Sequence, residues 1–312
     1  MLFKSATSRN IFSAVALGDV TTIGVSATLV SISYDNVRTA SLNEMRAAAQ
    51  QAAAEIKANL SDGYRMVTGL ETSVSSLRES GAATRDNVIA IFRKTLEGYP
   101  GAIGISTGWE PNAFDGKDAE HVGKPAHDAS GRFVPYVYRA GDEIKVEVLV
   151  DYDKPGAGDY YQLPVKTGRP VLMEPYIYPV NGKDVLMTTL SVPTRANGVV
   201  AGYVGADIDL DKTAADLAAK RPLGDGYIAL LSSGNAFVSH PDKAAMGKAL
   251  KDSGVDAAAW ERALANPGEA QTIVRPDGTE DLAVALPIVP FEGAVWNVVV
   301  SVPSATVYAN LS

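Results

Sequence analysis

The sequence predicts an α+β fold in which a long N-terminal helix precedes two tandem modules of antiparallel sheet. Three observations indicate this class. Residues 35–80 are rich in helix-forming residues, and residues 102–207 alternate short strand-like runs with Gly and Pro turns. Residues 226–302 then repeat a similar order of strands in shorter form. A length of 312 residues is compatible with about two domains.

The bulk composition excludes several kinds of site. The chain is 46% hydrophobic and 21% charged, which is ordinary for a globular protein. Its net charge of −8 argues against a nucleic-acid partner, because phosphate binding requires a basic surface. The chain contains no cysteine, so disulfides, thiolate metal sites and a cysteine nucleophile are excluded.

The N-terminal segment predicts a membrane anchor. Residues 11–34 are apolar over about the length that crosses a bilayer. Lys4 and Arg9 precede them, which places the tip in the cytoplasm by the positive-inside rule. Asp19 lies near the middle and costs about 3 kcal/mol on insertion scales. We therefore expect a cytoplasmic tip and an uncleaved anchor over residues 1–34, with a cleaved signal peptide as the rival interpretation.

Residues 35–81 predict a stalk helix that ends near Gly81. Apolar residues recur there at helical spacing, at Met45, Ala49, Ala52, Ile56, Leu60 and Met66. Such a helix is longer than a small core needs, so we expect it to pack against its twin in a homodimer. A break near residues 61–63 would give two helices instead.

The first module is predicted over residues 82–220, with a helix at 87–97 and another at 209–220. Its strands are expected near 102–108, 133–139, 144–150, 185–193 and 198–207. The dipeptides Gly141-Asp142 and Asn197-Gly198 predict hairpin turns.

The second module is predicted over residues 221–305. Its strands are expected at 226–231, 236–241, 270–274, 281–287 and 295–302, with helical segments around 243–252 and 256–265.

A stretch rich in tyrosine and aspartate, residues 150–209, has the composition of a binding site. It holds Tyr152, Tyr160, Tyr161, Tyr176 and Tyr178 among the 13 tyrosines of the chain. Rigid amphipathic rings beside carboxylates suit recognition of a small molecule.

Patterns typical of catalysis are absent. His121, His127 and His240 are scattered at spacings that do not suit a metal site. No nucleophile elbow, phosphate loop or zinc-protease motif occurs. Asp115-Gly116-Lys117-Asp118 lacks the alternating oxygen ligands of a calcium loop. We therefore expect neither an enzyme nor a bound metal or cofactor.

Several segments, taken in order, resemble the periplasmic double-Cache sensor region of bacterial methyl-accepting chemotaxis proteins. They are Gly108–Asp118, Asp159–Tyr161, Gly168–Tyr176, Thr189–Pro193 and Gly202–Leu210, and in the second module Gly234–Asp242 and Trp296–Pro303. The resemblance covers essentially the whole chain.

This resemblance implies a dimeric sensor in the bacterial inner membrane, with two PAS-like modules in the periplasm. The membrane-distal module, residues 82–220, would bind a small-molecule ligand. Residues 306–312 would begin a segment that leads to a second membrane helix and a signalling domain beyond Ser312.

In amino-acid-binding members of the family, an Arg two positions before an aromatic-Tyr pair holds the ligand carboxylate. A Tyr-x-Asp pair and a later Asp hold its ammonium group. The matching positions here are Tyr160-Tyr161, Tyr176 and Asp207, but Gly158 replaces the Arg and Tyr178 replaces the first Asp. A free amino acid would lose its carboxylate clamp and one ammonium acceptor.

The remaining rings and carboxylate suit a cation with few N–H donors. We predict a quaternary or methylated amine of the betaine or choline type, held partly by cation–π contacts. The candidate ligand-binding residues are Tyr160, Tyr161, Tyr176, Tyr178, Asp207, Trp109, Asp151 and Asp153. The competing interpretations are sheet packing for the tyrosines, a core position for Trp109, a helix cap for Asp207 and turn formation for Asp151 and Asp153.

Other functions stay open at this stage. The ligand could be a small carboxylate or amino acid, with Arg139 or Lys183 as anchors. The same module could belong to a histidine kinase or a cyclic-dinucleotide enzyme. A purely structural or solute-delivery protein would show no stabilisation by a ligand.

Overall fold

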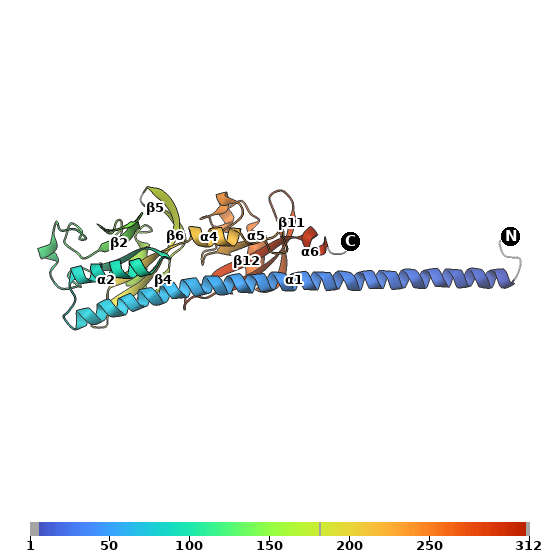
Figure 1. The fold of residues 1–312 in the computed structure, drawn as a ribbon, viewed down its shortest axis with the longest axis horizontal. Coiled ribbons are helices and arrows are strands. Elements are labelled where there is room, and N and C mark those ends of the chain that lie inside the picture. Colours follow the sequence, from blue (N-terminus) through green and yellow to red (C-terminus); the bar gives the residue numbers. More distant parts are fainter. Residues whose placement is uncertain (1–5, 181, 310–312) are drawn as a thin grey trace.

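The computed structural model describes residues 6–180 and 182–309, with side chains described from Asp35 onward. One helix, α1 (Ala6–Glu79), runs beneath two antiparallel sheets and continues past the second sheet toward the N-terminus (Figure 1). The first sheet lies over the end of α1 that is remote from the N-terminus. This arrangement confirms the predicted α+β class.

The first sheet has seven strands in the order β3-β2-β1-β7-β6-β4, and β5 also pairs with β6. The strands are β1 (Ala102–Trp109), β2 (Pro135–Ala140), β3 (Glu143–Val148), β4 (Val171–Leu172), β5 (Tyr176–Val180), β6 (Lys183–Ala196) and β7 (Val199–Asp209). The accompanying helices are α2 (Arg85–Gly98), the 3-10 helix η1 (Asp118–His121), α3 (Asp159–Thr167) and α4 (Asp211–Ala218). The sequence does not predict β4 or β5; β5 carries Pro179, which is tolerated because β5 pairs along one edge only.

The second sheet has five strands in the order β10-β11-β12-β8-β9. The strands are β8 (Tyr227–Leu231), β9 (Phe237–Ser239), β10 (Ala270–Val274), β11 (Glu280–Ile288) and β12 (Trp296–Pro303). The helices are η2 (Lys243–Ala245), η3 (Leu250–Asp252), α5 (Ala257–Ala265) and α6 (Ser304–Tyr308). The helical segment predicted at 243–252 is thus two short 3-10 turns.

The NG hairpin forms as predicted. Asn197 and Gly198 both have positive φ angles, 52° and 78°, which a tight turn between β6 and β7 requires. Gly141, with φ 68°, turns β2 into β3 in the same way.

Helix α1 is continuous through residues 61–63, so the alternative of two helices is wrong. Its buried positions recur every three or four residues: Leu42, Met45, Ala49, Ala52, Ile56, Leu60, Val67, Leu70 and Val74. This stripe packs against both sheets in one apolar core. Gly63 lies where the helix crosses the first sheet, and a Cβ there would stand 2.8 Å from Leu190 Cδ1. The glycine therefore permits close packing and does not break the helix.

The predicted anchor, residues 1–34, falls outside the residues whose side chains are described. Within the described part of the chain, no helical stretch combines the length and the hydropathy that a membrane span requires.

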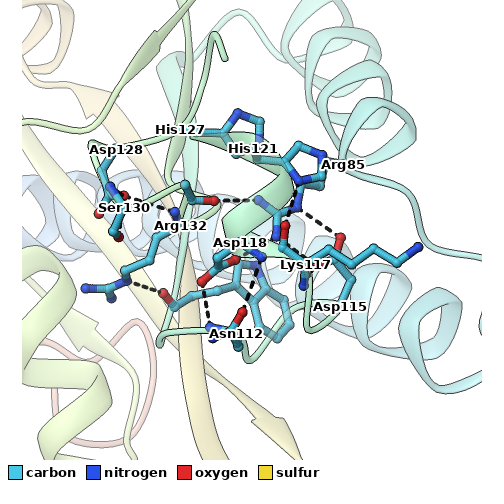
Figure 2. Close-up of polar contacts among 12 residues, drawn as sticks. Arg85, Asn112, Asp115, Lys117, Asp118, His121, His127, Asp128, Ser130 and Arg132 are labelled. Atoms are coloured by element: carbon cyan, nitrogen blue, oxygen red, sulfur yellow. Dashed lines mark hydrogen bonds and ion pairs between the residues drawn. The ribbon is translucent and has the colours of Figure 1, made fainter. Parts of the chain in front are cut away.

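A buried arginine fixes the loop that follows β1. Arg85, at the start of α2, is 4% exposed and binds Asp115 at 2.6 Å, Asp118 at 2.7 Å and the Gly131 carbonyl at 2.7 Å. Figure 2 shows these contacts converging on the guanidinium. Both carboxylates are therefore paired with Arg85 and serve to hold this loop in place.

Two stacked histidines lie in the same loop. The rings of His121 and His127 are 4.8 Å apart (Figure 2). Nδ1 of His127 is 2.6 Å from the Pro125 carbonyl, so this nitrogen donates, and Nε2 is buried with no partner among the described residues. Burial, with Arg85 and His121 nearby, lowers the pKa of His127.

We predict opposite effects from alanine at two glycines of α1. A Cβ added at Gly69 would meet no atom within 4 Å, so Gly69→Ala should raise the free energy of unfolding by about 0.5–1 kcal/mol through helix propensity. Gly63→Ala should gain the same helix propensity, but its new methyl group would overpack against Leu190 and lower the free energy of unfolding by about 1–3 kcal/mol. The net effect should therefore be destabilising. Urea unfolding of both variants tests this, and equal stabilisation by the two would show that the approach at Gly63 is not tight.

We predict that His127 makes the protein sensitive to acid. Its folded pKa is lowered below the unfolded value, so its contribution to stability is complete above about pH 6.5 and is lost as pH falls through that value and the folded pKa. His127→Asn, which keeps a donor for the Pro125 carbonyl, should lose less stability than the parent between pH 7 and pH 5 in urea unfolding. His240, whose pKa is also lowered, contributes equally to both proteins. Identical losses would contradict the prediction.

Candidate ligand-binding site

The first sheet presents two different faces, and a cavity lies on the face away from α1. Side chains alternate along a strand, so Ile105, Leu190 and Ile208 join the core with α1. The neighbouring positions Ser106 on β1 and Asp207 on β7 line a cavity of about 620 Å³. This volume lies within the range of small-molecule sites, roughly 300–1,000 Å³.

Asp207 is the buried charge of this cavity. Its carboxylate accepts hydrogen bonds from Tyr136 at 2.7 Å and Thr189 at 2.7 Å, with the Tyr176 hydroxyl at 3.5 Å. Burial raises the pKa of Asp207, and the three hydroxyls oppose that rise. No Lys, Arg or His among the described residues pairs with it.

Two neighbours that hold Asp207 were not predicted, Tyr136 and Thr189. Tyr136 reaches Asp207 across β1, where Gly104 pairs directly with Asp207. A Cβ at Gly104 would stand 2.4 Å from the Tyr136 ring, so the ring can lie there only because this residue has no side chain. The alternation of Tyr136 and Tyr138 along β2 is the sequence signal that could have identified this wall.

Three of the predicted tyrosines line the cavity. Tyr176 and Tyr178 alternate on β5 with the exposed Ile177, which points away. Tyr160, on α3, donates to the Val150 carbonyl at 2.6 Å and so joins the helix to the loop before it. Burial raises the pKa of all three phenols, and the Asp207 charge adds to this, so they remain protonated at neutral pH.

The cavity lining is acidic, and no basic side chain occurs among the described residues that line it. Besides Asp207 it includes four carboxylates, those of Glu147, Asp151, Asp159 and Glu174. Glu147 accepts from Tyr138 at 2.5 Å, and Asp159 accepts from the Gly156 amide at 3.0 Å. Asp151 pairs with the exposed Lys154 at 2.6 Å. The potential in the cavity therefore favours cations over anions.

Three predicted site residues do not reach this cavity. Trp109 is 1% exposed and packs against Phe114 and beneath Arg78, because its parity on β1 points it toward the helices. Tyr161 lies about a quarter-turn from Tyr160 on α3 and bonds Glu110 and Arg132 instead.

Asp153 is exposed and does not line the cavity, whereas Asp151 does. The capping alternative for Asp207 is also resolved. Asp209 accepts the Asp211 amide at 2.8 Å at the start of α4, while Asp207 turns toward the cavity.

The residues proposed to hold a carboxylate lie elsewhere. Arg139 donates to the Leu96 and Ala102 carbonyls, and Lys183 does not line the cavity. At Gly158, the position of the family arginine, a Cβ would stand 2.4 Å from the Tyr152 carbonyl oxygen. No side chain fits there without moving the loop over residues 150–158.

One lining residue joins the two modules. Glu174 precedes β5 and accepts hydrogen bonds from Ser232 and, at 2.8 Å, from the Gly234 amide in the turn between β8 and β9. A Cβ at Gly234 would stand 2.9 Å from the Glu174 carboxyl carbon. The cavity wall is thus bonded directly to the second module.

Comparisons with known proteins agree with this architecture. The family model for the methyl-accepting chemotaxis protein-like first PDC sensor domain matches residues 89–215. The methyl-accepting chemotaxis protein TlpQ of Pseudomonas aeruginosa is 29% identical over 238 residues, 71% of this chain and 33% of TlpQ. The chain spans about a quarter to a third of the length of the curated relatives it matches.

Solved structures show the same fold. The extracellular domain of mmHK1S-Z3, described as a histidine kinase, is 30% identical with a TM-score of 0.72, covering 86% of this chain and 96% of that domain. The ligand-binding domain of the Pseudomonas aeruginosa chemoreceptor PctB in complex with L-Arg is 20% identical with a TM-score of 0.59, covering 86% and 96% of the two chains.

The matching family model describes a sensor domain and the matching part of PctB is a ligand-binding domain, which agrees with the expectation that the chain is not an enzyme. The match extends over both sheets and the helix beneath them, beyond the first module alone. The chain therefore belongs to the double-Cache, or PDC, family of sensor domains that chemoreceptors carry.

Proposed function

We propose that this chain is the periplasmic sensor region of a chemoreceptor and that its first cavity binds a small organic cation. The observation that carries the proposal is Asp207, a largely buried carboxylate that has only hydroxyl partners and lines a cavity with no basic side chain among the described residues. A bound cation would give this carboxylate the opposite charge that the fold does not supply.

The tyrosines favour a methylated or quaternary amine of the choline type. Tyr136, Tyr160, Tyr176 and Tyr178 line the cavity around the carboxylate, and cation–π contacts contribute roughly 0.5–2 kcal/mol each. Two acceptor positions of Asp207 are already used by Tyr136 and Thr189, which leaves fewer for the N–H groups of a primary amine. Betaine is a weaker candidate than choline because its carboxylate would find no Lys or Arg in the lining.

The relatives support a sensory role and leave the ligand open. PctB is described in complex with L-Arg and with L-Gln, and PctC in complex with GABA. Each of these ligands carries an amino group, which could bind Asp207. Each also carries a carboxylate, for which the described lining of this cavity offers no Lys or Arg. We propose further that residues 1–34 anchor the chain in the inner membrane and that α1 packs in a homodimer. The second candidate is the sensor region of a histidine kinase, because the mmHK1S-Z3 domain is about as similar in sequence to this chain (30% identical) as TlpQ is (29%).

We predict that organic cations stabilise the protein through the first cavity and that this stabilisation depends on Asp207. Thermal-shift screening, confirmed by calorimetry, would compare choline, glycine betaine, putrescine, GABA, L-arginine and succinate. A ligand at about 100 times its Kd should add roughly 2.7 kcal/mol to the free energy of unfolding. Asp207→Asn should weaken cation binding by roughly thirtyfold or more, because truncating one partner of a buried charge pair costs about 2–5 kcal/mol.

Asp153→Asn is the matched control, since it removes an exposed carboxylate that does not line the cavity, and it should leave the affinity unchanged. Stabilisation by choline but not by putrescine would support the methylated-amine version. No stabilisation by any cation of the panel, or cation binding that survives Asp207→Asn, would overturn the proposal.

We predict that the same substitution stabilises the ligand-free protein. The pKa of Asp207 is raised on folding, so the ionised group costs stability at pH 7, and this cost disappears as pH falls and the folded carboxyl takes up its proton. Asp207→Asn should therefore raise the Tm at pH 7, with an advantage that shrinks toward pH 4. Scanning calorimetry at the two pH values checks this, and a lower Tm for the variant at pH 7 would show that the hydroxyl contacts outweigh the burial cost.

A further inference from the structure

The second module has a cavity of its own, of about 380 Å³, on the corresponding face of its sheet. Ile228 and Leu230 of β8 belong to the core shared with α1, whereas Ala229 faces the separate apolar cluster beneath α5. Trp260 and Ile273 of that cluster line the cavity. Both modules therefore keep a cavity on the side of the sheet that α1 leaves uncovered.

An arginine is held in place at this cavity. Arg275, at the end of β10, donates from Nε to Asp281 at 2.8 Å, and its guanidinium lies 5.4 Å from the centre of the Tyr227 ring. Asp281 is fully buried and is also bound by Ser301 at 2.6 Å, so it cannot turn away. Nη2 of Arg275 is buried and has no partner among the described residues. The Arg275 side chain is nevertheless 31% exposed, so the oriented guanidinium can still donate to a ligand in the cavity.

A second donor stands beside it. His240 lines the same cavity, and its Nδ1 lies 3.1 Å from the Asp242 amide and 3.4 Å from the Asp242 carbonyl oxygen. The shorter contact, in which Nδ1 accepts, places the proton of the neutral ring on Nε2. The ring packs against Phe237, Tyr227 and Trp260 at centroid distances of 4.6, 5.7 and 6.0 Å. These contacts hold the ring in one orientation.

The acidic residues of this lining are already engaged. Asp242 accepts the Ala244 amide at 2.9 Å, and Asp277 accepts the Thr279 amide at 2.9 Å. Both carboxylates thus serve local turns, while the Arg275 donors remain available. The chemistry is the opposite of the first cavity, whose lining holds five carboxylates and no base.

We infer that the second cavity binds a small carboxylate. Its carboxylate group contacts the guanidinium of Arg275 and Nε2 of His240, and its apolar body lies against Tyr227 and Trp260. The planar fork of arginine suits a carboxylate better than a point charge would. The inference stands independently of the ligand proposed for the first cavity.

Calorimetric titration of the full chain with benzoate, phenylacetate and pyruvate tests this inference, with benzamide as the uncharged probe. We expect at least one of these carboxylates to bind at one site and benzamide not to bind. Removing Arg275 alone would leave Asp281 buried without its partner, so the variant is the double substitution Arg275→Gln with Asp281→Asn. It should weaken carboxylate binding at least tenfold, while Asp153→Asn, at an exposed residue that lines neither cavity, should leave it unchanged.

His240→Phe is a second variant, which keeps the ring packing and removes the Nε2 donor. It should weaken the same carboxylate severalfold even if the double variant does not fold. The inference is overturned if no carboxylate of the panel binds, if benzamide binds as well as benzoate, or if neither variant reduces the affinity.

Discussion

A carboxylate without a counter-ion sets the main constraint on this structure. Asp207 lies at the floor of the first cavity, and its described partners are all neutral hydroxyls. Burying a charge is costly, and hydrogen bonds recover only part of the lost hydration. The arrangement holds because three strands supply the donors from fixed positions: Tyr136 from β2, Thr189 from β6 and Tyr176 from β5. The proposed cation site would explain why such a group is retained, because a bound cation would supply the missing charge.

The pleat of the first sheet separates this polar cavity from the core on the other face. Helix α1 can approach that other face closely because Gly63 has no side chain opposite Leu190. The same helix packs on the second sheet, and Glu174 bonds the cavity wall to the turn at Gly234. A ligand that favours one position of this wall would therefore act on both modules at once. Only a difference in affinity between the two positions is required.

The sequence was sufficient to predict the strands that are joined by strong turn signals. It was also sufficient to predict those site residues that lie within the tyrosine-rich stretch over residues 150–209. Asn197-Gly198 dictates a tight hairpin, and Tyr160, Tyr176, Tyr178 and Asp207 do line one cavity. Strand pairing cannot be read from local pattern, so Tyr136 and the permissive Gly104 opposite Asp207 were missed. For Trp109 the information was present. Its parity relative to Ser106 assigns it to the core face.

The two modules share a plan but differ in what they do with the face opposite α1. In the first, Asp207 projects from β7 with no cationic side chain beside it in the described part of the chain, and the cavity remains negative. In the second, the buried carboxylate is Asp281 on β11, and Arg275, directly after β10, already neutralises it. Only a bound cation could neutralise Asp207, since the described residues offer it none. Asp281 is already neutralised by Arg275, whose guanidinium can still donate to a ligand. For the ligands proposed here, a common fold fixes where the two cavities lie, and the placement of a single basic residue decides which sign of charge each cavity favours.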